Sequence, residues 1–419
     1  MSLDADALVI GAGPAGTAAA IWLAHGGWRV ILVEQHAYPR QKVCGECISA
    51  GGLTLLDELG VGGALRRMAG PELHQVGWMG SGETVVADFP PCTVGPYRYG
   101  RAVGRDRLDE LLLERARDLG VEVLQPAKVR ALHGAPGDFT CVIEARACKR
   151  PRPPTALDIK QTQTRRVRVV IDAHGSWELA PALTGDAPRC DAREVRRGSD
   201  LFAFKASFRD STLAPGLLPV LALNGSYGGI VVADDGRTTL ACCIRRDRLR
   251  ACRAAMPGAV AGVAVAAFLR GSCPGLRELL DHARLEGSWL TVGPIRPGIR
   301  VDDRPDTFRV GNAAGETHPL IGEGINMALQ SAKLLARHLL QQPVSTMDSR
   351  RTQELNRRYG AAWRLAFTPR LRYAAGYAQM AMRPAFTAPV HAMLTRWPRL
   401  LTRAARWAGK ARHSIVQLQ

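Results

Sequence analysis

The chain holds 419 residues, of which 46% are hydrophobic and 22% are charged, and this composition excludes a disordered chain. Its length exceeds that of a single typical core, so we expect two domains and an accessory segment. With 56 Lys and Arg against 38 Asp and Glu, the formal net charge is +18. Neither a signal peptide nor an apolar stretch long enough to span a bilayer is evident, so we expect a cytoplasmic protein and leave peripheral membrane association open.

Residues 5–34 predict a βαβ unit that binds a dinucleotide. The apolar run Ala7–Ile10 enters the sequence Gly-Ala-Gly-Pro-Ala-Gly, a helical stretch follows, and a second apolar run ends at Glu34. Such glycines permit the tight turn, the close approach of backbone N–H groups to a pyrophosphate, and the packing of helix on strand, while the acid accepts the ribose hydroxyls. The alternative is a glycine turn in an ordinary βαβ unit. The predicted site residues are Gly11, Gly13, Pro14, Ala15, Gly16 and Glu34.

Helices and strands alternate through the next part of the chain. The periodicity predicts helices over Gly51–Met68 and Arg105–Leu119 and strands within Val76–Phe89 and over Val121–Leu124, Thr140–Ala145 and Val167–Asp172. Residues 147–164 are Pro-rich and basic, so we expect an exposed excursion there.

The middle of the chain lacks βα alternation. Strands are predicted over Leu201–Phe208, Gly229–Ala233 and Thr238–Arg245, the last two joined by the turn Asp-Asp-Gly-Arg. We interpret this block as a sheet inserted into the nucleotide-binding domain, whose pattern resumes at Phe308–Gly311 and in a helix from about Gly324 to Leu340. The predicted division is a nucleotide-binding domain over 1–75, 98–180 and 285–342, a substrate domain over 76–97 and 181–284, and a helical C-terminal region over 343–419.

The C-terminal region is basic and rich in aromatic residues. Residues 345–419 contain 14 Lys and Arg, and their only acids are Asp348 and Glu354. The aromatic residues are Trp363, Phe367, Tyr373, Tyr377, Phe386, Trp397 and Trp407. This mixture is typical of contact with an anionic membrane surface or with an acidic carrier or partner protein. A helical cap with buried aromatic residues and solvated arginines would have the same composition. No recognition motif accompanies the charge, so we expect no nucleic acid.

A second glycine-rich segment carries a family resemblance. A short strand ends in Gly311-Asn312, a Pro-containing loop follows, and Gly322-Glu323-Gly324 opens a long helix. Together with Arg105-x-x-Leu-Asp-x-x-Leu, this segment resembles the FAD-dependent superfamily of aromatic hydroxylases, flavin halogenases and geranylgeranyl reductases, over residues 1 to about 340. The resemblance implies an α/β protein, with a Rossmann-like FAD-binding domain, an inserted antiparallel β-sheet substrate domain and a C-terminal helical segment.

The resemblance also implies positions around FAD. Asn312 is expected to hydrogen-bond the ribityl or pyrophosphate region, and Arg105 to lie near the phosphates or the ribityl chain. Residues near the pyrimidine edge of the flavin, at a helix N-terminus that stabilises its reduced anion, are expected to be Gly322, Gly324, Ile325 and Asn326.

Two positions depart from the family pattern. The family usually has Asp at the position of Asn312, and an amide there predicts FAD binding with altered affinity. Many hydroxylases have an Asp-Gly pair where this chain reads His174-Gly175, so the handling of the expected reductant, NADPH or NADH, stays open. The alternative role for His174 is that of a structural turn residue.

Of the ten cysteines, only Cys44 and Cys47 have a redox or metal spacing, and without a second Cys-x-x-Cys we expect no metal site. The stretch Arg40-x-Lys42-x-Cys44-Gly45-Glu46 resembles the geranylgeranyl reductase branch, where the cysteine lies near the flavin. The resemblance therefore adds Arg40, Cys44 and Gly45 to the cofactor site. Cys44 can pack against the flavin, take part in proton delivery, or form a redox pair with Cys47.

The favoured function is a monooxygenase of secondary metabolism that hydroxylates an apolar aromatic, polyketide-like or lipid-like metabolite with NAD(P)H and O2. His318 is the candidate base that activates a phenol, unless it only caps the following helix, and Cys44 is a second catalytic candidate. Possible pocket walls are Phe202, Phe204, Phe208 and Tyr227. One alternative is a reductase that saturates prenyl or polyene double bonds. A flavin halogenase, whose Trp-x-Trp-x-Ile-Pro segment is missing, and a non-catalytic flavoprotein partner are the others.

Overall fold

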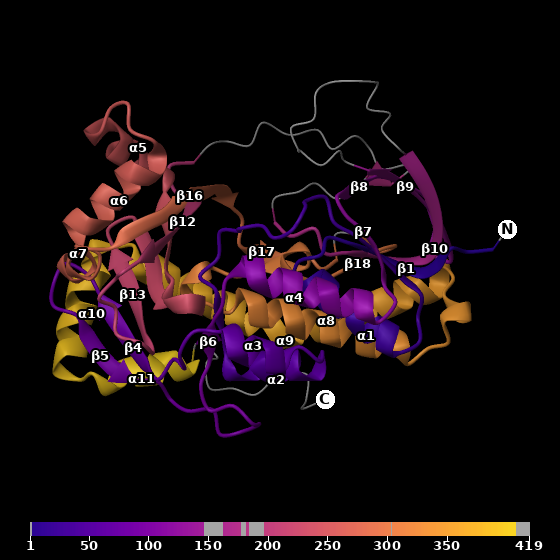
Figure 1. Cartoon of the computed structure of the whole chain (residues 1–419), viewed down its shortest axis with the longest axis horizontal. Coiled ribbons are helices and arrows are strands. Elements are labelled where there is room, and N and C mark those ends of the chain that lie inside the picture. The colour runs from indigo at the N-terminus through magenta and orange to yellow at the C-terminus, as the bar shows by residue number, and fades with distance from the viewer. Residues whose placement is uncertain (1, 146–161, 177–181, 184–196, 303, 408–419) are drawn as a thin grey trace.

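The computed structural model describes residues 2–145, 162–176, 182–183, 197–302 and 304–407. Figure 1 shows two lobes side by side along the long axis, one around each of two sheets. The mixed α/β fold predicted from the sequence is confirmed. Most of the predicted Pro-rich excursion, 147–161, lies outside the described residues, whereas 162–164 form the start of a strand.

The first sheet has eight strands in the order β11-β8-β9-β10-β1-β2-β7, with β18 beside β10. β1, β2 and β10 run parallel, and β1 and β2 are buried along their whole length, which explains their continuous apolar sequences. The strands are β1 (Ala5–Ile10), β2 (Val30–Val33), β7 (Glu122–Leu124), β8 (Ala127–Ala135), β9 (Asp138–Ala145), β10 (Thr162–Asp172), β11 (Ala182–Leu183) and β18 (Phe308–Arg309).

Helices pack along this sheet on the side seen in the lower part of Figure 1. α1 contacts both α4 and α8, and their apolar faces form the largest core of the molecule. The predicted helix over 51–68 is interrupted at Leu59–Val61 and forms two helices. The helices are α1 (Pro14–His25), α2 (Ala50–Glu58), α3 (Gly62–Met68), α4 (Arg105–Asp118) and α8 (Gly324–Leu340).

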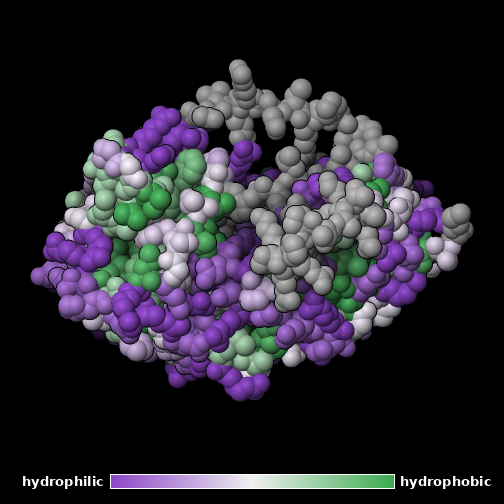
Figure 2. Space-filling model, turned by 45° about the horizontal axis from the view of Figure 1, so that its top comes forward, coloured by the Kyte–Doolittle hydropathy of each residue, from purple (hydrophilic) through white to green (hydrophobic). Residues whose placement is uncertain are grey.

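The second sheet has seven strands in the order β16-β12-β15-β14-β13-β4-β5. Three helices cover one of its faces: α5 (Arg246–Ala255), α6 (Ala261–Ser272) and α7 (Pro274–Leu279). Figure 2 shows hydrophobic side chains gathered on this lobe, where Val260 and Val263 are exposed. The strands are β4 (Gln75–Met79), β5 (Val85–Asp88), β12 (Leu201–Arg209), β13 (Leu217–Leu223), β14 (Ser226–Val232), β15 (Thr238–Arg245) and β16 (Arg284–Ile295).

The strands of the two sheets differ from the expectation in three details. The first two concern the second sheet, and the third concerns the first sheet. The second sheet is not purely antiparallel, because β13 pairs with β4 in parallel. β16 pairs with β12, so residues 285–295 belong to this sheet and not to the first one. Conversely, β11 lies in the first sheet beside β8 although 181–284 was expected in the second. Each difference arises from long-range strand pairing, which local sequence patterns do not encode.

Helices form the C-terminal region, as expected, within the described part that ends at Trp407. α9 (Ser349–Ala381) contacts α8 as well as β13 and β14 and so joins the two lobes (Figure 1). α10 (Pro384–Arg396) and α11 (Arg399–Trp407) pack against β5 at the edge of the second sheet. No helix in the described ranges is long and apolar enough to cross a membrane.

Candidate functional site

The first glycine loop connects β1 to α1 and has no room for a side chain at Gly11 or Gly16. Gly11 has φ +102°, and a Cβ on Gly16 would lie 1.9 Å from the carbonyl oxygen of Gly11. Pro14 is the first residue of α1, where its missing N–H leaves no helical bond unmade. The loop therefore presents bare backbone at the N-terminus of a buried helix.

Glu34, directly after β2, stabilises this loop by hydrogen bonds. One carboxylate oxygen accepts a hydrogen bond from the backbone N–H of Ala12 at 2.9 Å and the other from that of His36 at 2.9 Å. The Tyr38 hydroxyl donates to the carbonyl oxygen of Ala12 at 2.8 Å. A cleft with about 520 Å³ of empty volume opens here, lined by Gly11, Gly13, Glu34, Arg40, Lys42, Lys128 and His174 among others.

Three cationic side chains converge on the glycine loop. Arg40 lies 3.8 Å from Glu34, and a guanidinium nitrogen of Arg105 lies 3.7 Å from the position of a Cβ on Gly13. Burial, together with the charges of Arg105 and Arg40, lowers the pKa of Lys42 to about 8. Arg105 is held in place by two hydrogen bonds to Asp109, at 2.8 and 2.7 Å.

These groups fit the pyrophosphate of a dinucleotide. A loop in which a Cβ on Gly11 or Gly16 would collide with backbone leaves its N–H groups open to phosphate oxygens, and burial beside Arg105 and Arg40, which lowers the pKa of Lys42, favours an anion there. The sequence analysis placed Arg40 and Arg105 in this site but omitted Lys42. Its presence in the same Arg-x-Lys-x-Cys-Gly stretch was the signal that would have found it.

The second glycine segment packs directly against the first. A Cβ on Gly311, whose φ is +60°, would lie 2.6 Å from the Cβ of Ala15. The next residue, Asn312, donates from its side-chain amide to the Ser176 hydroxyl at 2.9 Å, and its backbone oxygen accepts from Arg300 at 2.8 Å. The structure thus brings together the two segments that the sequence separates by about 300 residues.

The entry to α8 is fixed by a buried amide. Gly322 adopts φ +60°, and Ile325 and Asn326 are buried in the first turn of the helix that starts at Gly324. The Asn326 side chain donates to Glu323 at 3.0 Å and accepts from the backbone N–H of Ser49 at 3.2 Å. Of the proposed flavin-edge residues, Asn326 is therefore already engaged within the chain.

His318 lies in the loop between β19 (Gly315–Glu316) and α8. Its Nδ1 is 3.2 Å from the hydroxyl of Tyr227 on β14. Burial lowers the pKa of His318 to about 4 and raises that of Tyr227 well above 10.0, so both side chains are neutral near pH 7. A base this weak does not retain a proton taken from a phenol, which favours hydrogen bonding over proton storage as the role of His318.

Cys44 and Cys47 are both free thiols in the structure. The sulfur of half-buried Cys44 accepts from the backbone N–H of Glu46 at 3.3 Å, while the buried thiol of Cys47 donates to the carbonyl oxygen of Gly45 at 3.3 Å. Their sulfurs are thus turned to different partners in one tight turn. The geometry does not show the disulfide form of a redox pair.

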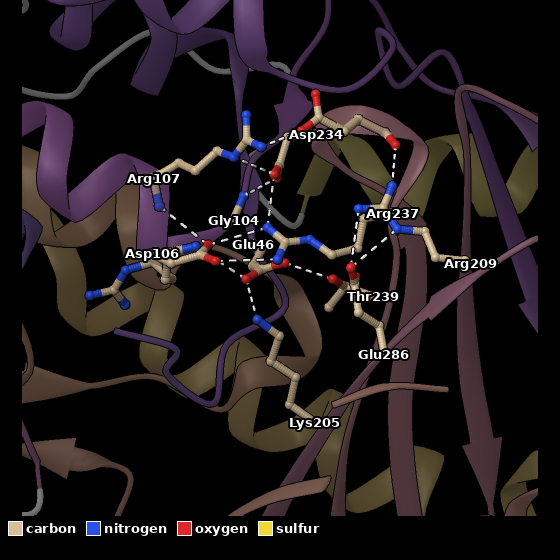
Figure 3. Close-up of polar contacts among 12 residues, drawn as sticks. Glu46, Gly104, Asp106, Arg107, Lys205, Arg209, Asp234, Arg237, Thr239 and Glu286 are labelled. Carbon is tan, nitrogen blue, oxygen red and sulfur yellow. Dashed lines mark hydrogen bonds and ion pairs between the residues drawn. The ribbon is translucent and has the colours of Figure 1, made fainter. Parts of the chain in front are cut away.

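Glu46, which the sequence analysis did not select, connects the two lobes. It is fully buried with φ +59° and accepts from the backbone N–H of Arg105 at 3.1 Å, from Thr239 at 2.7 Å and from the ammonium group of Lys205 (Figure 3). Thr239 and Lys205 belong to β15 and β12. A lone lysine in the otherwise apolar strand sequence Leu-Phe-Ala-Phe-Lys was the signal for a buried partner.

A second ionic contact lies beside it at the N-terminus of α4 (Figure 3). Asp234, in the turn between β14 and β15, accepts from the backbone N–H of Gly104 at 2.5 Å and from Arg237 at 2.8 Å. Burial opposes the ionisation of Asp106, but Arg237 outweighs it and holds the pKa of that carboxyl below its usual value. The loop that contains Glu46 and the N-terminus of α4 are therefore fixed to the second sheet by contacts of charged side chains.

An apolar pocket opens next to the α8 entry. Its volume of about 310 Å³ includes space open to solvent, and its lining residues are Ile48, Ser49, Leu73, Phe89, Pro90, Arg98, Tyr99, Gly100 and Leu218. Ser49 is also the residue whose N–H binds Asn326. The pocket thus adjoins the place where the sequence predicts the flavin edge.

Comparison with known proteins agrees with this geometry. A family model described as an FAD binding domain matches residues 4–149. The menaquinone reductase of Mycobacterium tuberculosis is 38% identical over 138 residues, which cover 32% of this chain and only 32% of that protein. The menaquinone reductase of Mycolicibacterium smegmatis is 26% identical over 399 residues, covering 87% of this chain and 84% of that protein. The solved structure of the flavin-dependent brominase Bmp2 aligns with a TM-score of 0.67 and 17% identity over 97% of this chain and 93% of that chain, a likeness of fold.

Proposed function

We propose that the chain is an FAD-dependent oxidoreductase that hydroxylates an apolar substrate with an oxygen atom attached to its ring. Support comes from the FAD binding domain model that matches residues 4–149 and from the similarity to a menaquinone reductase over most of the chain. NADPH or NADH and O2 would be its co-substrates. The observation that carries this proposal is the contact between buried Tyr227 and half-buried His318.

FAD, when bound, supplies the electron transfer and oxygen activation that a hydroxylation requires. The chain's own part is to hold it: the glycine loop, Arg40, Lys42 and Arg105 would bind the pyrophosphate, and Glu34 the ribose. Asn312 would bind the ribityl region. The N-terminus of α8, with Gly322, Gly324, Ile325 and Asn326, would face the pyrimidine edge, where its dipole stabilises negative charge.

Tyr227 and His318 form a polar pair in an apolar wall. Tyr227 is 1% exposed, and the cluster around it includes Leu201 and Ala203 with Val43 and Leu320 packed against it. The high pKa of Tyr227 keeps its hydroxyl protonated, and when this hydroxyl donates to Nδ1 the imidazole proton lies on Nε2. Such a pair recognises an oxygen on a ring, whereas an isolated prenyl double bond has no atom to bind it.

The pocket beside Ser49 would take the apolar part of the substrate. Its walls are mostly apolar, with Ser49, Arg98 and Tyr99 as the polar exceptions. Phe202, Phe204 and Phe208, which were expected as walls, instead pack in or against the core between the second sheet and α5–α7. A ring with an apolar side chain therefore fits better than a small polar aromatic.

A second candidate is the reduction of a double bond in a prenyl or polyene chain. It is favoured by the relative that matches nearly the whole chain, which is named a menaquinone reductase, and by the Arg40-x-Lys42-x-Cys44-Gly45 stretch. In that case the half-buried thiol of Cys44 would be the candidate proton donor.

Product mass separates the two reactions. The FAD-loaded protein is incubated with NADPH or NADH in air and with alkyl phenols and prenylated quinones. A gain of one oxygen atom supports hydroxylation, a gain of two hydrogen atoms supports the reductase, and unchanged substrates with steady NAD(P)H consumption contradict both. Tyr227→Phe is expected to lower kcat/KM for a phenol at least about fivefold, since a lost hydrogen bond to a buried group costs ~1–3 kcal/mol. Tyr97→Phe, at a hydroxyl bound to Asp57 and packed against a different hydrophobic cluster from that of Tyr227, is the matched control.

A further inference from the structure

The end of the chain combines unbalanced positive charge with exposed aromatic rings. From Leu355 to Gln419 the sequence contains 12 Lys and Arg and no Asp or Glu. Four of the six α9 arginines up to Arg370 have acidic partners: Arg351 and Arg358 pair with Glu354, Arg364 pairs with Asp302, and Arg370 lies 3.6 Å from Glu323. Such pairing is typical of a solvated helix surface.

Beyond Arg370 this pattern changes. Six arginines are exposed, and in the described part of the chain none of them has an acidic partner: Arg372, Arg383, Arg396, Arg399, Arg403 and Arg406. All six lie on the last turns of α9, on α10 and α11, or between them. The surface formed by residues 372–407, called here the basic aromatic surface, therefore has no counter-charge among the described residues.

The same surface exposes large aromatic side chains. Trp397 and Trp407 are each 56% exposed, Tyr373 is 50% exposed and Phe386 is 42% exposed. The rings of Tyr373 and Trp407 lie 6.1 Å apart, and the guanidinium group of Arg396 lies 5.8 Å from the ring of Trp397. A cap that only covered the core would bury these rings, as α9 buries Trp363 and Phe367.

α11 is amphipathic: one face is buried against the second sheet and the opposite face is exposed to solvent. Leu401 and Ala405 are buried against the second sheet, and the Thr402 hydroxyl donates to the carbonyl oxygen of Asp88 on β5 at 2.7 Å. Arg399, Arg403 and Arg406 are on the exposed side with Trp407. The helix is thus anchored on its apolar face while its basic face stays open.

We propose that the basic aromatic surface docks on an anionic lipid bilayer. Arginines bind lipid phosphates, and Trp and Tyr rings favour the headgroup region because they are apolar with one polar end. The apolar pocket lies behind this surface, since its lining residues Phe89 and Leu218 share a hydrophobic cluster with Leu394 and Leu401. A lipid-dissolved molecule would meet the protein on the side of that pocket. The docking itself does not depend on which reaction the protein catalyses.

Vesicle flotation with the whole protein tests this inference. We expect binding to vesicles of phosphatidylcholine mixed with an equal amount of phosphatidylglycerol, little binding to phosphatidylcholine alone, and release by ~1 M salt, where screening acts within ~3 Å. Arg399→Glu, Arg403→Glu and Arg406→Glu together should lower the partition coefficient about 100-fold, since each basic residue near the surface contributes ~1 kcal/mol.

The matched control carries the same charge change elsewhere. Arg67→Glu, Arg250→Glu and Arg253→Glu alter exposed residues on α3 and α5 and should leave vesicle binding within about twofold of wild type. Trp397→Ala with Trp407→Ala should weaken binding without changing its salt dependence. Equal losses in both arginine triples, or binding to an acidic protein or nucleic acid but not to vesicles, would overturn the inference.

Discussion

The backbone N–H of Ser49 donates a hydrogen bond to the side-chain oxygen of Asn326, at 3.2 Å and across 277 residues of sequence. A Cβ on Gly52 would lie 1.9 Å from that same oxygen, so the amide is enclosed by α2 as well. This contact ties the loop of Cys44–Cys47 to the entry of α8. It makes one site from two segments that each resemble part of a flavin enzyme.

Gly16→Ala is expected to weaken FAD binding at least about fivefold, because its methyl group would collide with the backbone of Gly11 and overpacking costs ~1–3 kcal/mol. The dissociation constant is measured by titrating cofactor-free protein with FAD. Gly376→Ala on α9 is the control, since nothing lies within 4 Å of its added methyl. An unchanged affinity in Gly16→Ala would show that the loop does not hold the cofactor.

Glu46→Gln should destabilise the protein by ~3–5 kcal/mol, because it leaves the buried ammonium group of Lys205 without its counter-charge. Urea unfolding measures the loss, and adding Lys205→Met should recover part of it. Arg284→Met removes an exposed pair with Asp210, whose side chains are 80% and 58% exposed, and should cost less than ~1 kcal/mol. Equal effects of Glu46→Gln and Arg284→Met would contradict a buried pair.

His318 should make stability depend on pH. Its pKa is about 4 in the fold and 6.5 when unperturbed, so between these values the unfolded chain binds the proton and the native protein does not. Stability therefore falls as the pH drops from 6.5 toward 4, by up to ~3 kcal/mol. His318→Gln should remove this part of the slope in unfolding measured across that range. A variant with the wild-type slope would refute the assigned burial of the ring.

Lys42 should couple FAD binding to proton uptake. Its pKa of about 8 means that it is partly neutral in alkaline solution, and a bound pyrophosphate would favour the charged form. At about pH 9, calorimetry in two buffers of different ionisation enthalpy should detect uptake of a fraction of a proton, and almost none at about pH 6. Lys42→Arg, which stays charged, should abolish the difference, and uptake that persists in this variant would point to another group.

Local patterns were enough for the first βαβ unit and for the amphipathic helix α4. Glycines at fixed offsets, an apolar strand and an acid at the next strand end each restrict the backbone over a few residues, so Gly11, Gly16 and Glu34 could be placed without a fold. The same holds for the entry of α8 at Gly324. These features depend on neighbours in sequence.

Other features depend on neighbours in space. The parallel pairing of β13 with β4 and the membership of β16 in the second sheet are set by strands far apart in the chain. The roles of Glu46 and Tyr227 depend likewise on Lys205 and His318, 159 and 91 residues away. No short segment contains both partners of such a contact.

The C-terminal region shows most clearly the difference between what the sequence predicts and what only the tertiary structure decides. The sequence by itself established that this region is basic, aromatic and helical, and it could not say whether the rings are buried or exposed. Only the packing of α9 to α11 decided this, burying Trp363 and Phe367 while leaving Trp397 and Trp407 in solvent. Composition determines which surfaces a chain can make, whereas burial depends on which face each helix turns to the rest of the molecule.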